Sequence, residues 1–450
     1  MREKWQRQMP LMPEIASHIQ AKELQAISAI LDSKPITIDF VLQDLCKGRP
    51  GDSRAGAKGM SAEQVLRAAV VMRLFGFSYQ ELAFHLVDSQ SIRGFCRIGI
   101  AGKGFKKSAL NKNIKALSDR TWEAINHEVL GYAKEEKIEK GRVARIDCTV
   151  VESNIHEPAD SSLLYDCVRV LSRLQEAARD LGAGRFGYHD HRRVAKRRMV
   201  KIRYARKKDE RRGAYIDLIK YTRKTLASAR TALERLRALG VDRPAAVGLL
   251  LELERYVALT ERVICQTERR VINAEKVPAS EKVVSIFEDH TDIIVKDRRD
   301  TFFGHKICLT GGRSNLILDC QIVEGNPADV TLTETMLDRQ KRIYGRHPLK
   351  AALDGGFASK DNLKAAKAMG IKDVCFAKKR GLETEDMCRS TYVYKKLRRF
   401  RAGIEAGISW LKRSFGLDRC TWKGWQSFKS YVWASIVSAN LLTIARKQLA

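Results

Sequence analysis

The sequence has little of what marks secreted, membrane-spanning or disordered chains. Only 9 of its 450 residues are proline, which argues against long disordered linkers. The longest uncharged run, residues 430–445, is shorter than the ~18 apolar residues of a membrane span, so we expect a buried helix there. The first ten residues are followed by no apolar stretch, and no signal peptide is expected.

Signatures of common metal and hydrolase sites are also missing. The 10 cysteines are irregularly spaced and none lies in a CxxC pair, so reduced and mostly buried thiols are expected. No spacing of His and Cys supplies four zinc ligands, and His156 and His305 are interpreted as structural or DNA-contacting residues. A Ser/His/Asp hydrolase is disfavoured because no GxSxG motif stands between a strand and a helix.

What the chain has in excess is positive charge. Its 83 Lys and Arg against 53 Asp and Glu give a formal net charge of +30, which favours a nucleic acid partner. Residues 185–212 contain thirteen Lys and Arg and three acids. We therefore favour a contact with phosphates over a merely solvated face. The residues expected to make this contact are Arg197, Arg198, Lys207 and Lys208.

Helix and strand signals divide the chain. Ser61 with Gln64, and Ser78 with Glu81, fit the capping box that begins a helix. Crowded β-branched residues predict a strand within 141–155, and residues 161–278 have a helical, charged pattern. Further strands are expected at 283–289, 292–296, 305–311, 315–323, 349–354 and 372–377, with helices near 330–342, 359–369 and 394–446.

This order predicts a mixed α/β fold. The core has mixed strand directions, as in ribonuclease H-like folds, and a long helical insertion interrupts it. The predicted parts are an all-α DNA-binding N-terminal domain (1–140), a catalytic core (141–160 and 279–420), a basic helical insertion (161–278) and a C-terminal helix (421–450).

Three acids are candidates for chemistry. Asp147 lies in the first core strand, Asp354 ends a later strand just before two glycines, and Glu405 lies in the last helical region. Arg401 and Lys412 share a helix face with Glu405. Converging carboxylates need a cation among them, and oxygen ligands suit Mg²⁺ or Mn²⁺. Two such ions support phosphodiester cleavage.

The other acids near Asp147 are interpreted differently. Glu152 and Glu157 lie beyond the expected end of the strand, and are expected to hold structure or to face solvent. Asp160 follows Pro158 and precedes an apolar helical pattern, so we expect it to be the N-cap of the inserted helices.

Several sequence blocks together resemble a known family. The blocks are MSAEQVLRAAVVMRLFGFSYQELAFHL, RIDCTVVESNIHEPADSSLL, FGHKICLT, VEGNPAD, ALDGGFAS and RAGIEAGISWLKRSFGLDRC. They resemble DDE-type transposases of bacterial insertion sequences, in the group with an InsH-like N-terminal domain, and most closely its ISNCY-like members. The resemblance covers about residues 55–445.

The resemblance implies roles for particular residues. In such enzymes the first Asp lies on the first core strand, the second on the fourth, and the Glu on a late helix. These positions correspond to Asp147, Asp354 and Glu405, which would hold two Mg²⁺ or Mn²⁺ ions. Arg401 and Lys412 match the basic positions of the motif around the Glu. Arg398 stands where the motif has Tyr, and all three basic residues are expected to bind DNA.

The resemblance also implies a reaction and a setting. The enzyme would cleave DNA at the ends of an insertion sequence and transfer the freed 3′-hydroxyl to target DNA. It would act as a homodimer on paired terminal inverted repeats, in the bacterial cytoplasm and at the nucleoid, without a membrane. Two alternatives stay open: a non-catalytic DNA-binding regulator derived from a transposase, and a structure-selective nuclease with the same core.

Overall fold

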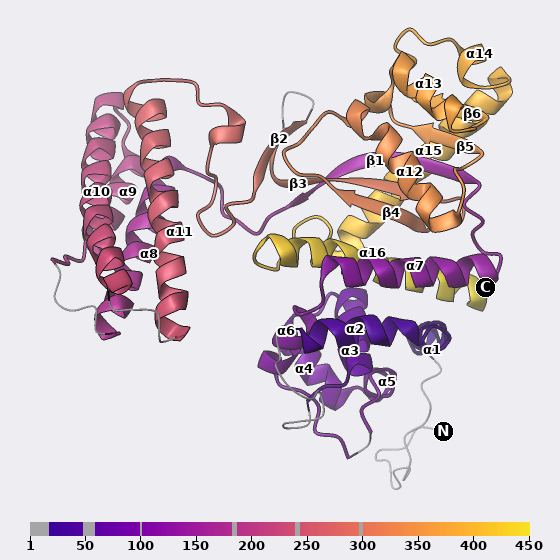
Figure 1. Cartoon of the computed structure of the whole chain (residues 1–450), viewed down its shortest axis with the longest axis horizontal. Coiled ribbons are helices and arrows are strands. Elements are labelled where there is room, and N and C mark those ends of the chain that lie inside the picture. Colours follow the sequence, from indigo (N-terminus) through magenta and orange to yellow (C-terminus); the bar gives the residue numbers. More distant parts are fainter. Residues whose placement is uncertain (1–17, 48–58, 100, 182–186, 239–243, 297–299) are drawn as a thin grey trace, which may run out of the picture.

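The computed structural model of the chain describes residues 18–47, 59–99, 101–181, 187–238, 244–296 and 300–450. The first ten residues, on which the signal-peptide expectation depends, and Arg185 of the basic stretch lie outside these residues. Figure 1 shows three groups of elements: a helical group at the bottom, a sheet with its helices above it, and an upright helical bundle on the left. No helix among the described residues is long and apolar enough to cross a membrane.

Helices make up the region before the first strand. They are α1 (Ile19–Asp32), α2 (Ile36–Cys46), α3 (Ala62–Phe75), α4 (Tyr79–Asp88), α5 (Gln90–Phe95), α6 (Lys107–Ile114) and α7 (Asp119–Glu135). Both predicted capping boxes are confirmed, because the Ser61 and Ser78 hydroxyls accept hydrogen bonds from the backbone N–H three residues later. In return, the backbone N–H of each serine donates to the side chain of that later residue, Gln64 or Glu81. Helix α3 ends at Gly76, whose φ of 69° suits glycine.

The last helix joins the helical group to the sheet. Helix α16 (Trp425–Leu449) contacts α1, α3 and α7 on one side and strand β4 on the other. Its side chains are buried almost without interruption between Phe428 and Ala445. The predicted buried helix over residues 430–445 is therefore confirmed.

The sheet contains β1 (Val143–Glu152), β2 (Asp292–Lys296), β3 (Asp300–Gly311), β4 (Ile317–Ile322), β5 (Lys350–Leu353) and β6 (Asp373–Phe376). Strand β3 pairs antiparallel with β1, β2 and β4, whereas β1, β5 and β6 run parallel. Neighbouring residues of β3 point to opposite faces, so Cys308 joins an apolar cluster with α12 and α13, while Ile307 and Leu309 join the cluster with α16. Both faces of the sheet are thus covered.

The prediction of a strand at residues 283–289 is wrong, because no strand is present there. The backbone N–H of Val283 donates to the Gln266 side chain, which in turn donates to the Val283 carbonyl. The Ser285 hydroxyl accepts from the N–H groups of Phe287 and Glu288 and so makes a turn. These backbone groups are therefore paired with side chains. Strand β2 is present at the next predicted position, so five strands, β1 to β5, precede Asp354 among the described residues, and not four.

The insertion between β1 and β2 is a bundle with its own apolar core. Its helices are α8 (Asp160–Asp180), α9 (Arg192–Tyr204), α10 (Lys208–Ala238) and α11 (Pro244–Thr267). The N-cap prediction for Asp160 is wrong, because Ala159 occupies that position. The Asp160 carboxylate instead accepts hydrogen bonds from Gln266 and Arg270 and ties the start of the bundle to its end.

The remaining helices follow the strands. They are α12 (Thr333–Tyr344), α13 (Lys360–Ala368), α14 (Thr384–Met387) and α15 (Thr391–Phe415), with a short turn of 3-10 helix, η4 (Gly355–Phe357), after β5. Helix α15 begins with the Ser390 side chain accepting from the Val393 N–H, and ends at Gly416 with a φ of 67°. It buries one apolar stripe, from Val393 to Phe415, and contacts β1, β5 and β6. This crossing brings α15 to the acidic residues of the sheet.

Candidate active site

The pairing of β1 with β5 brings the first two acids together. The two strands are parallel, and Ile146 is the partner of Leu353. The next residue along each strand is an aspartate, Asp147 on β1 and Asp354 after β5. In a parallel pair these residues lie side by side, Asp147 midway along β1 and Asp354 just past the end of β5. The local pattern of two strands therefore decides their proximity, although 207 residues separate them in the sequence.

The third acid comes from α15, which is held against β1 by a buried arginine. The Arg145 guanidinium donates to the Phe400 carbonyl of α15, at 3.1 Å, and to the Asn315 side chain in the β3–β4 turn, at 2.7 Å. It also lies over the Phe400 ring. Because Gly403 has no side chain, the helix approaches this guanidinium closely. Arg145 thus fixes the part of α15 that carries Arg401 and Glu405.

The three carboxylates converge on one guanidinium. Arg401 Nη1 lies 3.1 Å from Asp354 Oδ1 and 3.4 Å from Asp147 Oδ2, and Arg401 Nη2 lies 2.6 Å from Glu405 Oε1. The Arg401 and Asp147 side chains are largely buried, at 15% and 16% exposure, whereas Glu405 is 59% exposed. A cation among three acids offsets the repulsion that they would otherwise feel. The structure therefore brings all three predicted acids together.

The pKa of Asp147 reflects this setting. Burial raises it most, and the neighbouring charge of Asp354 adds to the rise. The backbone N–H of Cys148 donates to Asp147 Oδ1 at 2.8 Å and, with Arg401, opposes the rise. The balance puts the pKa of Asp147 at about 6, well above its ordinary 3.8. A carboxylate that resists ionisation in a cleft is typical of functional sites.

The donor set suits a hard divalent cation, since all its side-chain ligands are carboxylate oxygens. In this structure the shared counter-charge of the acids is the Arg401 guanidinium. Among the residues that the structure describes, no group of three or more His, Cys, Asp and Glu is arranged to hold a metal ion. The chemistry of the donors thus fits Mg²⁺ or Mn²⁺, and Arg401 occupies the common point.

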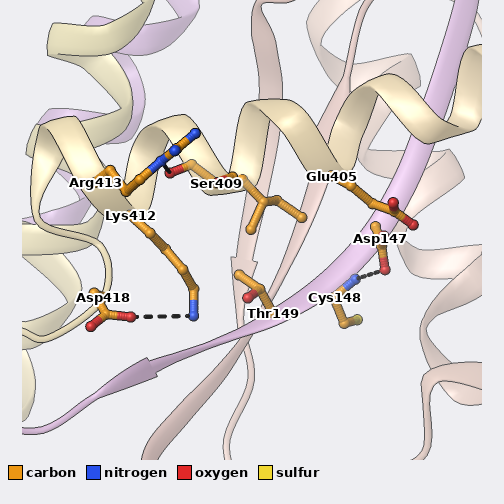
Figure 2. Close-up of a pocket in the computed structure, with 9 residues that line it drawn as sticks. Asp147, Cys148, Thr149, Glu405, Ser409, Lys412, Arg413 and Asp418 are labelled. Carbon is orange, nitrogen blue, oxygen red and sulfur yellow. Dashed lines mark hydrogen bonds and ion pairs between the residues drawn. The ribbon is translucent and has the colours of Figure 1, made fainter.

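A cavity of about 640 Å³ opens beside Asp147 and Glu405, between β1 and α15. Figure 2 shows Lys412 reaching along it toward Asp418, which it meets at 3.6 Å, and Glu405 turned toward Asp147. Lys412 thus lies near the acids but is paired with a residue that the sequence did not single out. The side chains that line the cavity are Asp147, Cys148, Thr149, Glu405, Ile408, Ser409, Lys412, Arg413 and Asp418.

Two of the lining residues that the sequence analysis missed are detectable in principle. Arg413 follows Lys412 directly, and Thr149 lies two residues after Asp147, on the same face of β1. Asp418 lies outside any regular element, and a backbone contact places it: its carbonyl accepts from the Glu152 N–H at 2.9 Å. No local pattern in the sequence gives that contact.

The other two acids near Asp147, Glu152 and Glu157, lie at the end of β1 and just after it. Glu152 pairs with Arg419 at 2.9 Å, which holds the end of β1 to the segment after α15. Glu157 is exposed. Both observations agree with the expectation that these acids hold structure or face solvent.

The predicted DNA-binding residues fall into two places. Arg398 is exposed on α15, one turn before Arg401, close to the acids along the same helix. Arg197, Lys207 and Lys208 are exposed in the insertion, which Figure 1 shows to the side of the sheet that carries Asp147. Arg198 is paired with Asp217 of α10, at 3.1 Å. The structure therefore places Arg401 among the acids and Lys412 at the cavity beside them. Arg398 lies one turn away on the same helix, and the four residues of the insertion lie elsewhere.

The two histidines differ in setting. His305 is buried, at 2% exposure, and its ring lies in a hydrogen-bonded chain with His290, Glu288 and Asp292. These hydrogen bonds give His305 a structural role, and its burial leaves no surface for contact with DNA. His156 is exposed and lies 3.8 Å from Asp166.

A comparison with known families bears on the region that contains two of these acids. Residues 289–441 match the family model described as the transposase DDE domain. The match includes Asp354, Arg401, Glu405 and Lys412, and excludes Asp147 and the insertion. It supports a DDE transposase, and with it an enzyme that acts on DNA. No curated protein and no solved structure matches the chain.

Proposed function

We propose that the chain is a DDE transposase that cleaves DNA at the ends of an insertion sequence and transfers the freed 3′-hydroxyl to target DNA. The observation that carries the proposal is the convergence of Asp147, Asp354 and Glu405 on the single Arg401 guanidinium. Acids from a central strand, the end of a neighbouring strand and a late helix have little structural reason to meet beside a cavity that two of them line. The family match over residues 289–441 supports the same function.

The finer assignments follow from the sequence resemblance. The core is ribonuclease H-like, and its sheet of three antiparallel and two parallel pairings supports this. The enzyme belongs to the ISNCY-like group and works as a homodimer on paired terminal repeats, in the bacterial cytoplasm and at the nucleoid. Residues 1–140 form the N-terminal DNA-binding domain, ahead of the core, the basic insertion (161–278) and the C-terminal helix (421–450).

Asp147, Asp354 and Glu405 are the residues that would hold two Mg²⁺ or Mn²⁺ ions. Bound there, the ions supply activation of the attacking oxygen and stabilisation of the leaving oxygen. Arg401 keeps the three carboxylates together by pairing with each of them. Lys412 and Arg413 add positive charge to the wall of the cavity, where a DNA phosphate gains from it.

The insertion supplies a second positive surface. Arg197, Lys207 and Lys208 are exposed, and none of them has an acidic partner among the described residues. Phosphate contacts position DNA without reading its sequence. We propose that this surface binds the end of the insertion sequence, that is, the DNA on the element side of the cleaved bond. Arg198 contributes less, because Asp217 neutralises it.

The test compares Asp354→Asn with Asp361→Asn. Asp361 is exposed in the first turn of α13, so its substitution makes the same charge change away from the acids. With Mg²⁺ and a labelled duplex that carries an element end, Asp354→Asn is expected to bind like wild type but to nick roughly 100- to 1,000-fold more slowly, the size of effect that loss of electrostatic stabilisation gives. Asp361→Asn is expected to nick normally.

Other outcomes separate the alternatives. Equal nicking by wild type and Asp354→Asn would remove the catalytic assignment. A wild-type protein that binds ends specifically and never nicks them would be a regulator. Cleavage of branched duplexes without any need for an end sequence, and without joined products, would indicate a structure-selective nuclease.

A further inference from the structure

The loop after β6 carries three consecutive cations. Lys378, Lys379 and Arg380 are exposed, and none has an acidic partner within ion-pair distance among the described residues. The chain turns back at the last of them, with φ of 48° at Arg380 and 84° at Gly381. Leu382 then returns to the apolar core and anchors the loop. The three side chains are therefore held together on the surface without neutralisation.

The sheet places this loop at the edge where Asp354 lies. Strands β5 and β6 are parallel, and Leu353 is the partner of Phe376. The Ala377 N–H donates to the Leu353 carbonyl at 3.0 Å, so the loop leaves the sheet beside Asp354. The stem of Lys378 packs on the turn after Asp354, since a Cβ on Gly355 would lie 2.8 Å from it. The first cation of the loop thus lies against the turn that follows a candidate metal ligand.

The positive surface continues onto α15. The Lys379 ammonium lies 6.0 Å from the centre of the Tyr394 ring, whose hydroxyl donates to the Phe376 carbonyl. Arg398, one turn further along the helix, is exposed. Burial raises the pKa of Tyr394, and the charge of Arg398 opposes that rise, as expected for a close neighbour. Lys378, Lys379, Arg380 and Arg398 together form what we call the β6-side surface.

This surface lies on one side of the acids, and the cavity lies on the other. On the cavity side Lys412 is partly neutralised by Asp418, and β1 runs out toward the insertion. Strand transfer requires two DNA segments at the same carboxylates, one that carries the 3′-hydroxyl and one that receives it. The insertion and the cavity account for one of them. The β6-side surface is free for the other.

We infer that the β6-side surface binds the phosphates of the target DNA, the duplex that receives the 3′ end. The inference rests on the proposed function. The four cations have no acidic partner among the described residues, and no amide side chain stands among them. Such a surface binds the DNA phosphate backbone irrespective of the DNA sequence. A single duplex held there meets the acids at its scissile phosphate, since Lys378 and Asp354 adjoin the same turn.

The experiment separates cleavage from joining. The variant K378A/K379A/R380A is compared with K360A/K364A/K372A, which removes three exposed cations from α13 and its neighbourhood. One substrate is a duplex with an element end and its flank, and the other is the same end already cut to expose its 3′-hydroxyl; a supercoiled plasmid serves as target with Mg²⁺. We expect K378A/K379A/R380A to cleave the first within ~2-fold of wild type and to join the second at least ~10-fold more slowly. The control variant performs both steps normally.

Loss of both steps to the same extent would assign the surface to the donor DNA, and loss of neither would leave it without a DNA role; either result overturns the inference. A binding measurement keeps the test independent of catalysis. For a 40-base-pair duplex of random sequence, three lost phosphate contacts are expected to reduce the slope of log K against log salt by about 2 to 3. An unchanged slope overturns the inference even where no cleavage is detected. If wild-type protein neither nicks nor joins while the slope falls as expected, the proposed function fails and the DNA surface stands.

Discussion

The core and the insertion use charge in opposite ways. In the core, three carboxylates from β1, β5 and α15 point inward at one guanidinium, and the two most central side chains are largely buried. In the insertion, the basic side chains of α9 point outward, away from the apolar core of the bundle. Charges that are brought together must offset one another within the fold. Charges that remain on a surface gain a partner only when a polyanion arrives.

The consequence is that the core acids carry a stability cost, and the insertion cations carry hardly any. Asp147 resists ionisation because of its burial and its acidic neighbour. Arg197 and Lys196 are exposed, so water already solvates them. Three sets of substitutions test this contrast.

The largest effect is expected for Asp147→Asn. The pKa of Asp147 is about 6 in the fold against 3.8 ordinarily, so its contribution to stability is full below pH ~4 and is lost as the pH rises through 6. At pH 8 the wild type carries a cost of up to ~3 kcal/mol that the asparagine removes. Urea unfolding should therefore show Asp147→Asn gaining stability relative to wild type between pH 5 and pH 8, although nicking is lost.

Asp361→Asn is the control for this pH dependence, because Asp361 is exposed and the change in charge is the same. Its free energy of unfolding should follow that of wild type across the range. If the gain of Asp147→Asn over wild type does not grow between pH 5 and pH 8 by more than that of this control, the acids of the core are not strained, and the contrast with the insertion disappears.

An intermediate effect is expected at two glycines of α15. A methyl group at Gly403 overlaps the Arg145 guanidinium, so Gly403→Ala should cost about 1–3 kcal/mol of stability and slow nicking through a shifted helix. Gly407, one turn later, has open space at the same position. Gly407→Ala should instead stabilise the helix by about 0.5–1 kcal/mol. Unfolding midpoints measure both, and equal effects would show that Arg145 does not fix α15.

The smallest effect is expected at neighbouring arginines of α9. Arg197 is exposed without an acidic partner among the described residues, whereas Arg198 pairs with Asp217. Arg197→Ala should leave stability unchanged and lower the salt slope of DNA binding by about 1. Arg198→Ala should cost up to ~1 kcal/mol and leave the slope nearly unchanged. If both variants show the same salt dependence of DNA binding, the basic residues of α9 merely face solvent and do not contact DNA.

Sequence patterns sufficed where local rules decide the structure. The capping boxes at Ser61 and Ser78 begin helices as expected, because three-residue spacing fixes both hydrogen bonds. Asp147 and Asp354 meet because each follows directly after one residue of the paired Ile146 and Leu353 on neighbouring parallel strands. Their roles as metal ligands stay predictions.

Patterns failed where distant side chains replace local partners. Residues 283–289 have a strand-like composition, but the side chain of Gln266 takes the hydrogen bonds of Val283. Asp160 had the setting of an N-cap, and Arg270 binds its carboxylate instead. The position of Arg401 among three acids could not be predicted either, because side-chain direction depends on how α15 crosses the sheet.

The packing of α16 on α7 has a consequence for folding during synthesis. Helix α7 ends at Glu135, and α16, which packs along it, begins roughly 290 residues later at Trp425. At about 5–20 residues per second of synthesis, the first helices wait on the order of 15–60 seconds for their partner. During that interval the apolar face of α7 is uncovered, so a nascent chain depends on chaperones or on provisional packing. The N-terminal helices reach their final packing only after the acids of the core have been synthesised.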